Sequence, residues 1–178
     1  EDIDVSKVTT NDYESSFAAT EHLIEQGCKK IAYLVINKNI SIGKVRGQGY
    51  MDALAKHQIP FDDQLVIDCS QDERENYSII KGALKRTRPD GIFSSVERLA
   101  LATYHVCNDL KIDVPKDLKI ISFSSLQIAP LLCPALSTIT QPAYEMGIKA
   151  ADLLFEELEN IEIDGSKKHI ILESWLFI

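Results

Sequence analysis

The sequence contains no run of about 18 or more apolar residues, which is the length needed for a helix that crosses a bilayer. Its first residues include Glu1, Asp2 and Asp4, whereas a secretory signal begins with basic residues and an apolar run. These two absences predict a protein that has no contact with a membrane and stays in the cytoplasm.

Basic residues are scarce relative to acidic ones. The chain has 19 Lys and Arg residues against 27 Asp and Glu residues, a formal net charge of -8 at pH 7. A surface of this charge repels nucleic acid phosphates. We therefore do not expect the chain to bind duplex DNA by itself.

Cysteines are few and scattered. Cys28, Cys69, Cys107 and Cys133 form no C-x-x-C pair, and no histidine stands at ligand spacing from them. We predict reduced thiols, no disulfide and no metal site.

The motifs of common enzyme classes are missing as well. The patterns G-x-G-x-x-G, G-x-x-x-x-G-K-[ST] and G-x-S-x-G do not occur. The four histidines fall within predicted helices or at the start of the last predicted strand, with no carboxylate or nucleophile at a telling spacing. We predict no catalytic residue, no cofactor and no enzymatic activity.

Apolar runs and amphipathic stretches alternate along the chain, which is 45% hydrophobic and long enough to bury a substantial core. After an extended segment at 3–10, strands are predicted at 31–36, 65–69, 91–93, 118–123, 136–140 and 170–178. Helices are predicted at about 13–26, 45–57, 73–86, 97–110 and 143–159. This order predicts an α/β protein with a mostly parallel, doubly wound sheet.

Ligands of such sheets bind at the carboxyl ends of the strands, where polar stretches follow the apolar runs at 37–46, 68–71, 94–97 and 122–125. Arg46 is the notable cation among them, because a guanidinium offers a fork of donors to a carboxylate, a phosphate or vicinal hydroxyls. A solvated arginine in the first turn of a helix is the alternative.

Three other candidate residues have structural alternatives. Asp12 and Glu97 stand where they could cap helices, Glu97 through a capping box with Ser94, or could contact a ligand. Ser124 could simply satisfy the backbone at the end of a strand. The segment that carries Leu126, Leu131 and Leu132 between prolines fits either the core or a dimer interface.

Several stretches, in this order along the chain, resemble the lac and galactose repressor family of bacterial transcription regulators. The stretches run from V-T-T-N-D-Y-E to K-K-I-A-Y-L, then R-G-Q-G-Y-M-D-A-L, R-P-D-G-I-F-S-S-V-E-R-L-A-L-A, V-P-K-D-L-K-I-I-S-F-S-S and Q-P-A-Y-E-M-G. Together they cover about residues 8–160, and the last seven residues are the most specific.

The resemblance implies two α/β lobes, as in periplasmic sugar-binding proteins, with a small effector between them, in a homodimer whose helix-turn-helix headpiece binds DNA. By the family pattern the chain is a fragment without that headpiece. Residues 1–28 and 141–160 would be remnants of an amino-terminal lobe, 29–140 the carboxy-terminal lobe, and 161–178 a segment that returns to it. The helices near 13–26 and 143–159 would then lack their sheet and pack on each other or on another chain.

The resemblance also assigns effector-binding residues. Arg46 matches the ligand-contacting arginine of the family, and Asp12 lies near its acidic residue at the first crossover. Val96 and Glu97 replace the usual Asn-Asp pair, and Ser124 replaces an Asp, so hydrogen-bond acceptance from sugar hydroxyls is weaker there.

The sequence thus predicts the ligand-sensing and dimerisation core of a transcription regulator. Its partners would be a small effector, a second copy of the chain and, through the headpiece, DNA. Effector binding would change operator binding by rotating the lobes. A solute-binding protein of a transporter shares the fold, and a flavodoxin-like enzyme using Arg46 and Glu97 on an anionic substrate is the third alternative.

Overall fold

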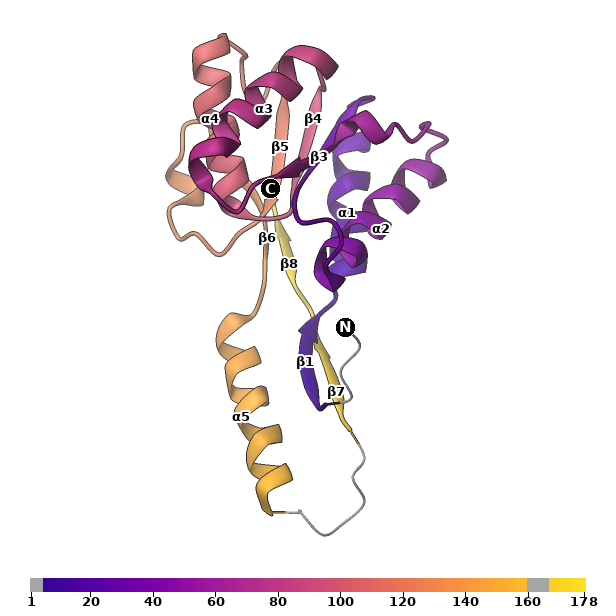
Figure 1. Cartoon of the computed structure of the whole chain (residues 1–178), viewed down its shortest axis with the longest axis vertical. Coiled ribbons are helices and arrows are strands. Elements are labelled where there is room, and N and C mark those ends of the chain that lie inside the picture. The colour runs from indigo at the N-terminus through magenta and orange to yellow at the C-terminus, as the bar shows by residue number, and fades with distance from the viewer. Residues whose placement is uncertain (1–4, 160–166) are drawn as a thin grey trace.

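The computed structural model describes residues 5–159 and 167–178, so Ile3 and part of the predicted terminal segment lie outside the described residues. Two regions lie one below the other in Figure 1: a lobe built on a six-stranded sheet, and a narrower stalk formed by one helix and two strands.

The sheet of the lobe has the strand order β3-β2-β4-β5-β6-β8. The first five strands run parallel, and β8 pairs antiparallel with β6. In chain order its strands are β2 Ile31–Ile36, β3 Val66–Cys69, β4 Gly91–Ser94, β5 Lys119–Phe123, β6 Ser137–Thr140 and β8 Trp175–Phe177. The predicted class, a mostly parallel doubly wound sheet, is confirmed.

Helices cover both faces of this sheet because the central strands are apolar on both sides. On β2, Ala32 and Leu34 belong to one core cluster, while Ile31, Tyr33 and Val35 belong to the other. Two helices lie on each face: α1 Asp12–Glu25 and α2 Ser41–Lys56 on one, α3 Glu73–Thr87 and α4 Glu97–Leu110 on the other. Two short 3-10 helices, Asp63–Leu65 and Ala129–Leu131, lie in the connections.

The stalk consists of β1 Lys7–Thr10, β7 His169–Leu172 and α5 Ala143–Glu159. The strands β1 and β7 form a two-stranded parallel sheet of their own, and α5 contacts β1. Figure 1 shows that the chain crosses between stalk and lobe three times, after β1, before α5 and after β7. The strand β1 and the helix α5 of the stalk fall within the ranges 1–28 and 141–160 that the family pattern assigns to remnants of a second lobe, whereas β7 falls within the range 161–178.

The helix α1 differs from the expectation that it would lack a sheet. Its buried residues Ala19 and Leu23 join the core cluster of the lobe, and the helix lies along α2. Small side chains on this face, Ser16 and Ala19 among them, allow the two helices to pack closely, since both residues are fully buried. The helix α5 has no such cover, and Leu154, Phe155 and Leu158 are exposed.

The predicted terminal strand at 170–178 is two strands. Glu173 and Ser174 interrupt the apolar run, and the backbone N–H of Ser174 donates to Asn11 Oδ1 at 2.8 Å. The strand β7 therefore stays in the stalk, and β8 joins the sheet of the lobe.

Candidate functional site

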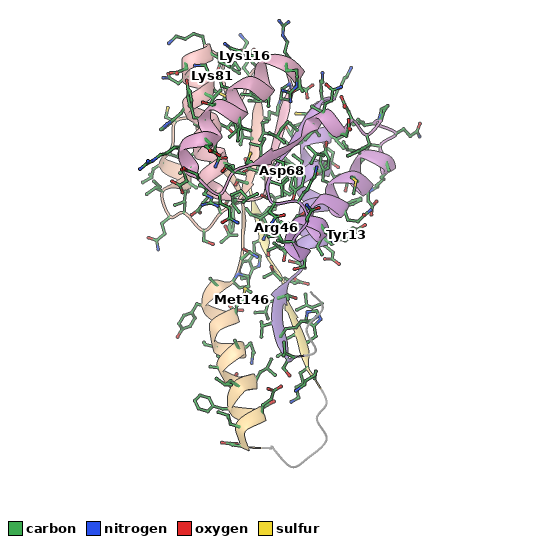
Figure 2. All side chains as sticks on the ribbon, viewed as in Figure 1. Tyr13, Arg46, Asp68, Lys81, Lys116 and Met146 are labelled. Atoms are coloured by element: carbon green, nitrogen blue, oxygen red, sulfur yellow. The ribbon has the colours of Figure 1, made fainter. Side chains whose placement is uncertain are left out.

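The polar residues that follow the parallel strands meet at one edge of the lobe. Ser94 and Ser122 are register partners on β4 and β5, and the N–H of Ser95 donates to the carbonyl of Leu34 on β2. This edge faces the stalk, as the position of Arg46 in Figure 2 shows. The four predicted polar stretches therefore end on the side where the chain crosses between the two regions.

Arg46 is buried, with 4% of its surface exposed, in the second turn of α2. Its Nε donates to Asp12 Oδ1 at 2.7 Å, Nη2 lies 2.6 Å from the same oxygen, and Nη1 donates to the carbonyl of Ser95 at 2.5 Å. Its guanidinium also lies 3.5 Å from the ring centre of Phe123. These contacts rule out a solvated arginine, and they join α2 to α1, β4 and β5.

Burial and the charge of Asp12 shift the pKa of Arg46 in opposite directions. Burial lowers the pKa of Arg46, because it removes water from the cation, and the carboxylate of Asp12 opposes that shift. Since an arginine keeps its proton in proteins, the pair is a buried ion pair. All three guanidinium nitrogens have protein partners, so the cation is held in one orientation.

Asp12 connects Arg46 to the stalk. Its Oδ2 accepts from Thr10 Oγ1 at 3.0 Å, and Thr10 Oγ1 in turn accepts from Gln141 Nε2 at 2.6 Å. Thr10 is the last residue of β1, and only Pro142 separates Gln141 from α5. Two of the three crossings between lobe and stalk are therefore linked by one chain of hydrogen bonds. Asp12 is the first residue of α1 rather than its N-cap, which is Asn11.

Glu97 and Ser124 form a second pair. Ser124 Oγ donates to Glu97 Oε2 at 2.9 Å, and the N–H of Ser125 donates to the same oxygen at 3.3 Å. The alternative of a capping box is wrong, because Ser94 Oγ donates to the carbonyl of Val96 instead and the carboxylate of Glu97 points to the loop after β5. Val96 is the N-cap, half-buried against the core.

The structure thus brings the five predicted effector residues to one edge, as the pairs Arg46–Asp12 and Glu97–Ser124, with Val96 directly before Glu97 in the chain. Sequence reasoning missed Thr10, Ser95, Phe123 and Gln141. The signal for Gln141 is its position at the head of the specific Q-P-A-Y-E-M-G stretch, and that for Phe123 is its position at the end of a buried strand.

A hollow of about 680 Å³ lies between the starts of α1 and α2 and the strands of the stalk, and Val96, Glu97 and Ser124 are not among the residues that line it. Asp12 and the first turns of α2 form one side of it, and β1 and β7 form the other. Arg46 lies beneath this lining, so within the described residues Asp12 is the member of the ion pair that a small molecule in the hollow meets.

The three residues predicted at a dimer interface differ in their exposure. Leu131 is 80% exposed, whereas Leu126 and Leu132 are half-buried and pack against the core of the lobe. No group of three or more His, Cys, Asp or Glu side chains that would hold a metal occurs in residues 5–159 and 167–178. Over the same residues, no helix combines the length and the apolar character needed to cross a bilayer.

Comparisons with known proteins agree with this fold. Residues 20–173 match the model of the periplasmic binding protein-like domain. The chain is 29% identical over 154 residues to Catabolite control protein A of Staphylococcus xylosus, covering 86% of this chain and 46% of that protein. It is 33% identical over 157 residues to the HTH-type transcriptional regulator GalR of Escherichia coli, covering 86% and 45%.

Solved structures extend the likeness. A regulatory protein of the LacI family from Chloroflexus aggregans superposes with a TM-score of 0.88 at 26% identity, over 100% of this chain and 64% of that one. The LacI family regulator from Enterococcus faecium with bound ribose has a TM-score of 0.89 at 24% identity, over 100% and 66%, and shows the fold alone. The chain spans about half the length of the relatives it matches. It belongs to the family of periplasmic binding protein-like domains, and it is a domain of the kind found in the lac and galactose repressor family.

Proposed function

We propose that this chain is the sensing part of a DNA-binding transcription regulator that responds to a small effector in the cytoplasm. The observation that supports this best is the shared edge of the parallel sheet, where Asp12, Glu97 and Ser124 are fixed by hydrogen bonds. Side chains held in this way recognise a ligand without a further loss of conformational entropy. The names of the relatives, which include a catabolite control protein, an operon repressor and a transcriptional regulator, point to the same role.

The effector would be a sugar or a related metabolite. Relatives of similar fold were solved with ribose and as a cellobiose complex. In this chain Glu97 Oε2 is held by Ser124 and Ser125, and Asp12 borders the hollow. Arg46 would act from beneath by fixing Asp12. A rotation of stalk against lobe would then transmit binding to a headpiece and its operator.

The regulator would act as a homodimer. Leu131 exposes most of its side chain close to a hollow of about 310 Å³ lined by Leu126, Phe177 and Ile178. We expect this exposed apolar surface to pack against its copy across a twofold axis. Leu131→Asp should shift the chain from dimer to monomer in light scattering, while Leu158→Asp in the stalk should not.

An enzymatic role is not favoured. The charge of Asp12 is paired with that of Arg46, and among the residues the structure describes neither Asp12 nor Glu97 is hydrogen-bonded to a histidine or a cysteine that would complete a catalytic pair. The predicted alternative of an enzyme acting on an anionic substrate needs Arg46 at the surface, and the residue is buried. We propose a binding protein without turnover.

The test uses calorimetry with ribose, galactose and cellobiose on the chain, and operator binding by the longer protein that contains it. Glu97→Gln combined with Ser124→Ala should weaken effector binding by at least about tenfold, because two positioned polar groups are lost. The control Asp152→Asn, on the exposed face of α5, should leave it unchanged. Equal binding by the double variant and the wild type, or ligand without any effect on operator affinity, would contradict the proposal.

A further inference from the structure

The charges of this chain are segregated. Three segments, 26–30, 81–90 and 108–119, hold nine of the 19 basic residues but only four of the 27 acidic ones, a net charge of +5. The remaining 151 residues carry a net charge of -13. The basic residues of the three segments are Lys29, Lys30, Lys81, Lys85, Arg86, Arg88, Lys111, Lys116 and Lys119.

The fold brings the three segments to one end of the lobe, which we call the basic end. Lys30 precedes β2, Asp90 precedes β4 and Lys119 begins β5, three strands that pair side by side. The N–H of Asp90 donates to the carbonyl of Lys30, and that of Lys119 donates to the carbonyl of Asp90. Figure 2 places Lys81 and Lys116 at the end of the lobe opposite to Met146 and the stalk.

The nearby carboxylates leave most of this charge uncompensated. Asp90 uses both of its oxygens on the backbone N–H groups of Lys29 and Lys30, and Asp117 accepts from the N–H of Asp113. Of the nine basic residues, Lys81 is the one that takes part in an ion pair among the residues the structure describes, with Asp109. Seven of the nine are exposed, all except Lys81 and Lys119.

Helix termini account for only part of the cluster. Lys85 and Arg86 lie in the last turn of α3, and Arg88 and Lys111 are C-caps, positions where a cation stabilises the helix dipole. Four of the lysines lie on loops or at the start of a strand, away from any helix C-terminus that a cation would stabilise: Lys29, Lys30, Lys116 and Lys119. The loops and the helix ends therefore converge on one positive surface.

We propose that the basic end is a docking surface for an acidic segment of another protein. Its distance from the stalk and from the effector edge leaves it accessible when those parts are covered. At physiological ionic strength the Debye length is about 8 Å, so a partner at this surface meets the local positive charge rather than the negative charge of the whole chain.

A flexible acidic peptide fits this surface better than duplex DNA. The duplex is a stiff rod whose phosphates extend beyond the basic end and along a body of net charge -13. The four acidic residues interspersed among the basic ones, Asp109 and Asp113 included, would also repel a continuous row of phosphates. A short peptide can instead place its carboxylates over individual lysines.

The proposal is tested with a fluorescein-labelled ten-residue peptide that contains six glutamates, followed by anisotropy on the 178-residue chain at 50 to 300 mM NaCl. The basic-end variant combines Lys85→Gln, Arg86→Gln and Lys116→Gln. The control variant combines Lys38→Gln, Lys44→Gln and Lys149→Gln, which removes the same charge from exposed lysines elsewhere. Circular dichroism confirms that both variants are folded.

We expect the wild type to bind the peptide and the basic-end variant to bind it about tenfold more weakly at 50 mM NaCl, since three surface ion pairs are lost. The control variant should change affinity by less than about twofold. An equal loss in both variants would show that net charge alone is responsible and would overturn the proposal. Tighter binding of a 20-base-pair duplex than of the peptide, or no peptide binding by the wild type, would overturn it too.

Discussion

The lobe and the stalk contain similar apolar side chains, but the lobe buries them whereas α5 in the stalk leaves most of them exposed. In the lobe, Phe93 on β4 is fully buried on the face of the six-stranded sheet that α1 and α2 cover. In the stalk, α5 has 17 residues and a single buried one, Leu153, while Phe155 is 62% exposed. A two-stranded sheet offers too little surface to cover a helix of this length.

An amphipathic pattern therefore identifies a helix face that would be stabilised by packing against another element. It does not show that such an element is present. The helix α5 carries an apolar stripe as clear as those of α3 and α4, yet it has a single buried residue. The helix α2 carries a weak pattern, interrupted by Arg46 and three glycines, yet Tyr50, Ala53 and Leu54 on it are buried. The presence of a complete sheet nearby decides the outcome.

Two phenylalanines make this comparison measurable. Phe93→Ala should lower the free energy of unfolding by about 4 kcal/mol, because it empties a packed space that also contacts Tyr33 and Phe123. Phe155→Ala should change it by less than about 0.5 kcal/mol, because an exposed ring loses few contacts. Urea unfolding followed by circular dichroism measures both. Similar losses in the two variants would mean that the stalk is packed as firmly as the lobe.

Two aspartates, one in the lobe and one in the stalk, allow the same comparison for charged side chains. Asp12→Ala should cost about 3 kcal/mol of unfolding free energy, since it leaves the buried cation of Arg46 without its partner. Asp152→Ala removes the exposed partner of Lys149 in the stalk and should cost less than about 0.5 kcal/mol.

The control for the buried pair is the double variant Asp12→Ala with Arg46→Met, which removes the cation as well. It should be more stable than Asp12→Ala alone, because no unpaired charge remains in the lobe. If the double variant loses the sum of the two single losses, Arg46 contributes through packing on Phe123 rather than through its charge.

Gln141 lies at the boundary of the two regions and links them through Thr10. Gln141→Ala should destabilise the chain by about 1 kcal/mol, the net value of one buried hydrogen bond. Hydrogen exchange should speed up in β1 and α5 and stay unchanged in β4 and β5, because the lobe keeps its own core. Faster exchange throughout the chain would show that lobe and stalk unfold as one unit.

The architecture of the lobe could be predicted because it depends on local patterns. Apolar runs of four to six residues separated by amphipathic stretches define the parallel strands and their helices, and the polar ends of parallel strands must share an edge. The five predicted effector residues do lie at that edge. Whether they contact an effector remains a prediction.

The contacts within the site could not be predicted because they join residues far apart in the chain. Asp12 and Arg46 are 34 residues apart and Glu97 and Ser124 are 27 apart, and their pairing follows from the packing of α1 on α2 and of β4 beside β5. The position of α1 was missed for the same reason. Its small buried residues indicate close packing, but they do not indicate the partner.

The smallest expected effect concerns Glu21, which holds α1 to α2 through Lys56 and His57. Hydrogen bonds from Lys56 and then from His57 lower its pKa below the ordinary value of 4.5. Because the pKa is lower in the folded state, Glu21 contributes stability above about pH 4.5, and the contribution disappears as the pH falls through the lowered value. Glu21→Gln should therefore lower the melting temperature slightly at pH 7, and its difference from the wild type should shrink as the pH falls below about 4.5. Lys56→Gln should remove part of the same pH dependence, since Lys56 is the larger cause. A difference between wild type and Glu21→Gln that grows toward pH 3 would show that these contacts do not stabilise the carboxylate, and that the two helices are held together by their apolar faces alone.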